Sequence, residues 1–124
     1  MILDAGFLIS VNRGERTAQV FLAAALVHET PLTTPHPVVA QVWRDGARQA
    51  RLAPFLQSVV VVTFDAGPEG GNLLARSGTS DVVDAHLVVV AVRRAELILT
   101  GDAHDLELLA AALPEHRPHV LSWP

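Results

Sequence analysis

Short apolar runs and stretches with helical spacing alternate along this chain. The apolar runs predict five strands, at 1–3, 30–34, 58–64, 96–100 and 119–122. Apolar residues three or four positions apart predict helices at 7–12, 16–28, 38–49, 52–56, 72–77, 79–91 and 104–113. Strands therefore alternate with helices from one end of the chain to the other.

The predicted strands are apolar on both faces, whereas a strand with one face in water would alternate with polar residues. This pattern is typical of a parallel sheet that helices cover on both sides. We therefore expect an α/β fold, a three-layer α/β/α sandwich with a central parallel sheet of four or five strands. No repeat, low-complexity tract or linker interrupts the 124 residues, so we expect a single domain over 1–124.

The composition excludes several classes of protein. Half of the residues are hydrophobic, which excludes a disordered chain, but the apolar runs stop short of the roughly 20 residues of a membrane span. There is no signal-peptide pattern and no cysteine for disulfides or zinc–thiolate sites, so we expect a cytoplasmic protein. The net charge is −4 and lysine is absent. If such an acidic protein acts on nucleic acid, it needs local basic patches or a bridging metal ion.

Aspartates stand where predicted strands end and where one helix begins. Asp4 follows the strand at 1–3, and Asp102 follows the strand at 96–100. Asp81 and Asp84 open a helix that is otherwise almost wholly apolar, where a carboxylate is costly unless something holds it. Because sites in open parallel sheets form at the carboxyl ends of strands, we expect Asp4, Asp84 and Asp102 to share one crevice.

Crowded carboxylates repel one another, and a hard divalent cation such as Mg²⁺ or Mn²⁺ relieves that repulsion. We therefore expect a metal site built from Asp4, Asp84 and Asp102, with Asp81 beside it. Structural alternatives stay open for single residues. Asp81 and Asp102 each stand where a helix cap is expected, and Asp105 is expected to strengthen the first turn of the helix near His104.

Four segments carry a resemblance to a known family: MILDAGFL, VVAQVWR, DVVDAHLVVVA and LILTGDAHDL. They resemble the conserved blocks of PIN-domain ribonucleases, particularly the VapC-type toxins of bacterial toxin–antitoxin pairs. The blocks occur in the family's order and extend over nearly the whole chain; each alone is modestly specific, and all four together are quite specific.

The resemblance implies a PIN-like fold and a Mg²⁺- or Mn²⁺-dependent endoribonuclease that hydrolyses RNA phosphodiester bonds. It implies that Asp4, Asp84 and Asp102 are the catalytic and metal-binding residues, that Asp81 is an additional acid and that Thr100 is a supporting hydroxyl. It also implies a cognate antitoxin and a homodimer as the protein's assembly. As a separate expectation, the apolar side chains of the first helices exceed what one small core needs: Phe7, Leu8, Phe21 and Leu22.

One position departs from the family pattern. Gln41 stands in VVAQVWR where the family usually has a glutamate, which removes one negative charge from the expected site. We therefore expect weaker metal binding than in a relative with glutamate. The alternative hypothesis is a catalytically weakened or inactive PIN-like module that only binds RNA or protein.

Basic and aromatic residues give weaker signals. Arg44, Arg48 and Arg51 recur at helical spacing, as expected either for contacts with RNA or an antitoxin or for a solvated helix face. The six histidines include no pair suited to zinc on one helix, although His86 and His104 lie near the acids in sequence. The two tryptophans are expected to pack rather than to stack on bases.

Two other α/β classes fit poorly. A receiver domain also collects aspartates at strand ends, but it needs a lysine, and this chain has none. A phosphate-binding loop needs glycines followed by lysine, and GPEGG at 67–71 lacks both the lysine and the spacing.

Overall fold

The computed structural model describes all residues from 1 to 124. Five strands form one sheet: β1 (Ile2–Leu3), β2 (Thr33–Pro35), β3 (Val60–Val62), β4 (Ile98–Thr100) and β5 (Val120–Ser122). Seven helices connect them: α1 (Ala5–Arg13), α2 (Arg16–Val27), α3 (His36–Val42), α4 (Leu52–Gln57), α5 (Gly67–Ser77), α6 (Val82–Arg94) and α7 (Ala103–Ala111). None of the helices combines the length and the apolar character that crossing a membrane requires.

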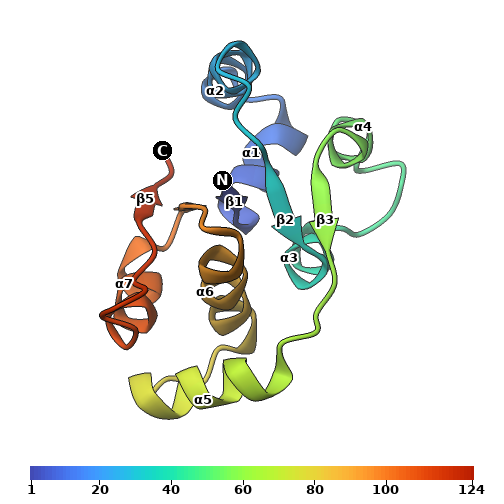
Figure 1. The fold of residues 1–124 in the computed structure, drawn as a ribbon. Helices are drawn as coiled ribbons and strands as arrows, with labels where there is room; N and C mark the ends of the chain where they lie inside the picture. Colours follow the sequence, from blue (N-terminus) through green and yellow to red (C-terminus); the bar gives the residue numbers. More distant parts are fainter.

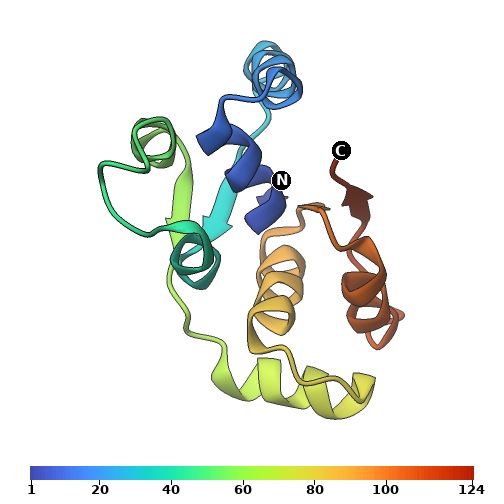
Figure 2. The same ribbon diagram turned by 180° about the vertical axis from the view of Figure 1, so that it is seen from behind.

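All strand pairs are parallel, and the spatial order is β3-β2-β1-β4-β5. This arrangement confirms the predicted α/β fold with a central parallel sheet. From β1 the chain steps outward to β2 and then β3, and from β3 it returns across the sheet to β4 and then β5. Right-handed crossovers therefore place α1 to α4 on one face and α5 to α7 on the other, as Figures 1 and 2 show from opposite sides.

The reversal of direction makes β1 and β4 the pair at the topological switch point. Connections leave these two neighbouring strands toward opposite faces, and the region beyond the carboxyl ends of such strands is where α/β proteins bind ligands. The register pairs Ile2 with Ile98 and Leu3 with Leu99. Asp4 and Thr100 are thus the next residues along, at the carboxyl ends of these strands.

The core explains why α6 is apolar on nearly every side. This helix packs on β1, β2 and β4 and is flanked by α5 and α7, so it has little surface in water. Every residue from Ala85 to Ala91 is buried. The main cluster of 21 buried hydrophobic residues joins this helix to the strands and to Phe7 and Leu8 of α1.

The predicted helix at 38–49 is wrong beyond residue 42. Helix α3 ends at Val42, and Trp43 is extended, with φ −68° and ψ 133°. The side-chain oxygen of buried Gln49 accepts bonds from the backbone amides of Arg44 and Asp45, each at 2.9 Å. This bonding supports a compact loop in place of further helical turns.

Helix α5 begins at Gly67, five residues before the predicted start at 72. Its glycine-rich first turn is a poor helix former. However, Pro68 fixes a backbone φ angle that suits the first turn of a helix, and the positive end of the helix dipole stabilises the Glu69 carboxylate. Gly70 is buried, and a Cβ atom there would lie 4.0 Å from that of Ala85 on α6. Packing against α6 therefore overrides the weak local propensity.

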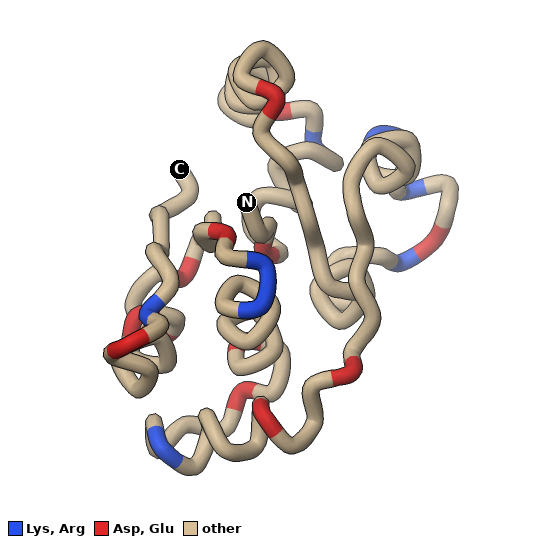
Figure 3. The backbone as a smooth tube through the Cα atoms, in the orientation of Figure 1, with Lys and Arg blue, Asp and Glu red and all other residues tan.

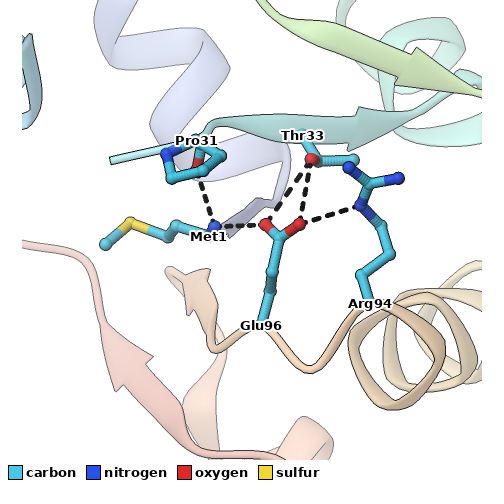
Figure 4. A network of polar contacts seen from close by, with 5 residues as sticks. All are labelled: Met1, Pro31, Thr33, Arg94 and Glu96. Carbon is cyan, nitrogen blue, oxygen red and sulfur yellow. Dashed lines mark hydrogen bonds and ion pairs between the residues drawn. The ribbon is translucent and has the colours of Figure 1, made fainter. Parts of the chain in front are cut away.

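A polar network fastens the amino end of the sheet, opposite the carboxyl ends of the strands (Figure 4). The Glu96 carboxylate accepts bonds from the Met1 amino group and from Arg94, and the Met1 amino group also donates to the Pro31 carbonyl. Burial alone would raise the pKa of Glu96, but the bonds from Met1 and Arg94 hold that pKa below its usual value. The network ties β1 to the segments that enter β2 and β4.

Candidate active site

Asp4 is held in a fixed orientation between β1 and α1. It is the N-cap of α1, where its Oδ1 accepts a bond from the Ala5 amide at 2.7 Å. Its Oδ2 accepts a bond from the Thr100 hydroxyl at 2.6 Å, and the residue is only 9% exposed. A buried carboxylate normally costs free energy, and these two charge-assisted bonds offset part of that cost.

Thr100 links Asp4 to the segment that carries Asp102. While its Oγ1 donates to Asp4, the same oxygen accepts a bond from the Asp102 amide at 2.9 Å. Asp102 occupies the N-cap position of α7 but makes no capping bond with its side chain. Asp102 was expected either to cap the helix or to bind a metal ion, and the capping bond is not observed. Its exposed carboxylate is therefore available for a ligand.

Sequence reasoning missed the glycines that let these two segments approach. A Cβ atom at Gly6 would lie 3.4 Å from the backbone nitrogen of Gly101, so the first turn of α1 lies against the loop after β4. The signal was present in the sequence, since a glycine lies within two residues of each aspartate, in DAG and TGD. A Cβ atom at Gly101 would lie 3.9 Å from Cα of Gly6, so the two segments are in van der Waals contact at these glycines.

Asp81 and Asp84 lie at the start of α6, as predicted. Asp81 is the N-cap, and its Oδ1 accepts a bond from the Asp84 amide at 3.0 Å, so its structural role as a cap is confirmed. Asp84 lies in the first helical turn and is half-buried. Asp105 lies in the first turn of α7, where the positive end of the helix dipole stabilises a carboxylate.

These carboxylates share one electrostatic environment. Burial raises the pKa of Asp84 to about 7, together with the negative charges of Asp81, Asp4, Asp102 and Asp105. The charges come from three separate segments of the chain, at the end of β1 and at the starts of α6 and α7. Near neutral pH, Asp84 is therefore close to the balance between its charged and neutral forms.

The donor chemistry of these residues fits a hard divalent cation, which prefers oxygen ligands and relieves repulsion between carboxylates. The side chains do not surround a common point as they stand, and no three histidine, aspartate or glutamate side chains are arranged to hold a metal ion. Asp4 keeps free lone pairs on both oxygens, while Asp102 is exposed and unengaged.

Gln41 and the three arginines occupy surroundings that the sequence did not predict fully. Gln41 is exposed near the end of α3. The expectation that Arg44, Arg48 and Arg51 lie along one helix is wrong, because the loop after α3 carries Arg44 and Arg48, and Arg51 is the N-cap of α4. All three side chains are exposed.

His86 and Trp123 both make packing and hydrogen-bonding contacts within the protein. His86 is buried, and its Nε2 lies 3.1 Å from the Thr63 carbonyl. Its ring centroid lies 4.5 Å from that of Phe64, with the two rings tilted by 41°. Burial lowers the pKa of His86. Trp123 packs edge-on to Phe7 at 4.8 Å and donates a hydrogen bond to Ser10, which confirms the packing role predicted for it.

The exposed apolar surface lies on α2, the helix that also carries Phe21 and Leu22, and both of these residues are partly buried against the core. Phe7 and Leu8 are completely buried, so the expectation that they exceed the core is wrong. By contrast, Leu26 and Val27 are 81% and 78% exposed. A groove of about 700 Å³ also separates α2 from the C-terminal segment, and it is lined mainly by apolar side chains, including Val20, Phe21, Leu121 and Trp123.

Comparison with known proteins identifies the fold. The sequence matches no family model and none of the curated proteins. The structure is similar to that of a chain in VapBC2 from Rickettsia felis bound to a DNA fragment from their promoter, with a TM-score of 0.69. The sequences are 14% identical, and the match covers 99% of this chain and 98% of that chain. This protein therefore has, over its whole described length, the fold of a chain in that VapBC2 complex.

Proposed function

We propose that this protein is a PIN-like, Mg²⁺- or Mn²⁺-dependent endoribonuclease that hydrolyses RNA phosphodiester bonds, as the toxin of a type II toxin–antitoxin pair. The observation that carries the proposal is the Thr100 hydroxyl, which binds Asp4 and the Asp102 amide at the switch point of the sheet. The four blocks that resemble VapC-type toxins support it, as does the fold shared with a chain of VapBC2.

Each acidic residue has a role in this proposal. Asp4, Asp84 and Asp102 would hold the cation directly or through water, with Asp81 as an additional acid. A bound Mg²⁺ or Mn²⁺ would offset the negative charge that develops on the phosphate and would activate water for attack. Thr100 would orient Asp4, because its hydroxyl fixes one of the two carboxylate oxygens.

The test is cleavage of RNA by purified wild-type and variant proteins. We expect Asp4→Asn and Asp84→Asn each to reduce Mg²⁺-dependent cleavage by on the order of 100-fold or more, with the fold intact by circular dichroism. Asp65→Asn is a matched control, because Asp65 is exposed and pairs with Arg93, which keeps its second partner Glu69. Cleavage by both site variants at the wild-type rate would refute the assignment.

A second candidate function is favoured by Gln41. A site with glutamine in place of the family's glutamate has one negative charge fewer, so a weakened nuclease or a module that only binds RNA or protein is the alternative. Titration of Mn²⁺ into wild type and Gln41→Glu distinguishes these cases. We expect tighter binding by the variant, since ligand charge governs affinity for hard cations, and equal affinities would remove this explanation.

We also propose that the protein forms a homodimer and binds a cognate antitoxin. The exposed apolar side chains of α2 support a protein partner, because Leu26 and Val27 would otherwise remain in water. Sedimentation equilibrium of the purified chain should give a mass of about twice 13.3 kDa. A monomer at all concentrations would contradict the dimer.

A further inference from the structure

The turn between α1 and α2 lies against the loop between α3 and α4. The Asn12 side-chain amide donates to the Arg48 carbonyl at 3.1 Å, and the Arg51 guanidinium donates to the Asn12 carbonyl at 3.5 Å. Gly14 has φ 67°, and a Cβ atom there would lie 2.7 Å from Nε of Arg51, so the two segments are closely packed. These contacts place the segment that carries Arg13 and Arg16 beside the segment that carries Arg44, Arg48 and Arg51. We call this region the arginine surface.

The arginine surface has a charge opposite to that of the rest of the protein. Segments 12–16 and 43–51 contain five arginines and two acids, Glu15 and Asp45, whereas the remaining chain contains four arginines and eleven acids. Figure 3 shows basic segments gathered on the loop between α3 and α4. Acidic segments predominate around α5, α6 and α7 in the same view. The net charge of −4 therefore hides a strongly polarised distribution.

Ion pairing sharpens this difference. Outside the arginine surface, three of the four arginines pair with carboxylates: Arg93, Arg94 and Arg117. Within it, the Arg13 and Arg48 pairs are exposed, at 3.9 and 3.3 Å, where solvent makes such pairs weak. The other three have no carboxylate partner: Arg16, Arg44 and Arg51. Arg44 and Arg51 each use one guanidinium nitrogen to donate to backbone carbonyls, and their other N–H groups remain available for an external anion.

The surroundings of these arginines favour phosphate groups over a protein partner. A protein interface usually has an apolar centre, but none of the large exposed hydrophobic side chains lies in segments 12–16 or 43–51. Guanidinium groups bind phosphate oxygens in a bidentate manner, and contacts of this kind position nucleic acids without reading their sequence. Arg16 borders the apolar groove between α2 and the C-terminal segment, whereas the other four arginines do not line it. Those four guanidinium groups match a phosphate backbone.

We propose that the arginine surface binds the phosphate backbone of single-stranded RNA and holds the strand across α1 toward the acidic residues. Helix α1 connects the two regions directly, because Asp4 caps its start and Arg13 is its last residue. Its nine residues span roughly 13 Å, a distance that a short stretch of RNA covers. The proposal rests on the proposed ribonuclease function, since it assigns the path of that enzyme's substrate.

The test measures RNA binding without cleavage. The full-length protein is titrated, in EDTA, into a fluorescently labelled single-stranded RNA of mixed sequence, and anisotropy is followed at several salt concentrations. We expect Arg16→Gln/Arg51→Gln to reduce the slope of log K against log salt by about 1.4, because each phosphate contact to single strands contributes about 0.7. Arg76→Gln/Arg117→Gln is the matched control, with two exposed arginines removed elsewhere, and should leave the slope unchanged.

Three results would overturn the proposal. One is an equal loss of slope in both double variants, and another is no loss in either. The third is binding of polyglutamate, but not RNA, through Arg16 and Arg51, which would make the surface a site for an acidic protein. Because the assay contains no divalent metal, a protein that binds RNA as expected but never cleaves it would contradict the ribonuclease function alone.

Discussion

At the scale of single residues, Thr100 determines the geometry of the candidate site. Its hydroxyl donates to a carboxylate oxygen of Asp4 and accepts from the backbone amide of Asp102, although the two aspartates lie far apart in sequence. The family resemblance implies that Thr100 is a supporting hydroxyl, and in the structure this hydroxyl binds both segments. Removing this hydroxyl should therefore affect both stability and the orientation of Asp4.

Thr100→Val should destabilise the fold by about 1–3 kcal/mol, because it leaves a buried acceptor and a donor without their partner. It should also weaken Mn²⁺ binding, whereas Thr100→Ser should restore both properties. Thr34→Val is the control, since Thr34 is equally buried on β2 but donates only to the Leu3 carbonyl at 3.0 Å. Chemical denaturation and Mn²⁺ titration measure the two effects. An equal loss of Mn²⁺ affinity in Thr34→Val would contradict a specific role for Thr100.

Asp84 should make the stability of the metal-free protein depend on pH. The pKa of Asp84 is about 7 in the folded protein and 3.8 for an unperturbed aspartate side chain. Between these two pH values the folded state keeps the proton that the unfolded chain has lost. The contribution of Asp84 to the free energy of unfolding therefore falls as pH rises from about 4 to 7. The difference in the free energy of unfolding between wild type and Asp84→Asn isolates this contribution from that of Glu96, whose pKa is shifted in the opposite direction. Denaturation curves whose difference does not change with pH would show that Asp84 is not perturbed.

At the scale of secondary structure, the start of α6 combines a cap with a carboxylate cluster. Asp81 caps the helix through the Asp84 amide, and its charge also raises the pKa of Asp84. The opening acids of this helix thus have a structural role as well as the metal-binding role that we propose. Two substitutions can separate these roles.

Asp81→Ala should cost about 1 kcal/mol of stability, whereas Asp81→Asn should cost only a few tenths, because asparagine is also a good N-cap. Denaturation at pH 5 suits this comparison, since Asp84 is then mostly protonated and repulsion between the two side chains is small. Both variants should lower the pKa of Asp84, followed by NMR titration. The cap explanation fails if alanine and asparagine destabilise the protein equally.

Element boundaries show where local sequence stops being sufficient. The alternation of strands and helices was predicted correctly, because it depends on apolar runs that burial in a parallel sheet requires. The end of α3 was not, because it depends on Gln49, whose side chain captures backbone amides of the loop. The start of α5 was not, because the packing of Gly70 on α6 outweighs the low helix propensity of glycine.

At the scale of the whole molecule, the strand order brings the segments that carry Asp4 and Asp102 next to each other. The sequence showed acids at strand ends but not that β1 and β4 are neighbours, and only that adjacency lets Thr100 reach Asp4. The grouping of Arg13 and Arg16 with the loop after α3 was equally invisible, because the contact through Asn12 joins segments more than thirty residues apart. Local pattern thus predicted the fold class and the acids, while tertiary packing determined the surfaces.

A single divalent cation shared by Asp4, Asp84 and Asp102 is the central feature of the proposed nuclease site. The most direct measurement is an anomalous difference map from crystals of the protein grown with Mn²⁺. We predict one strong peak at coordination distance from oxygens of at least two of these aspartates, and its loss in crystals of Asp84→Asn. Ordered density for all three side chains with no peak between them, or a peak only elsewhere on the surface, would contradict the claim.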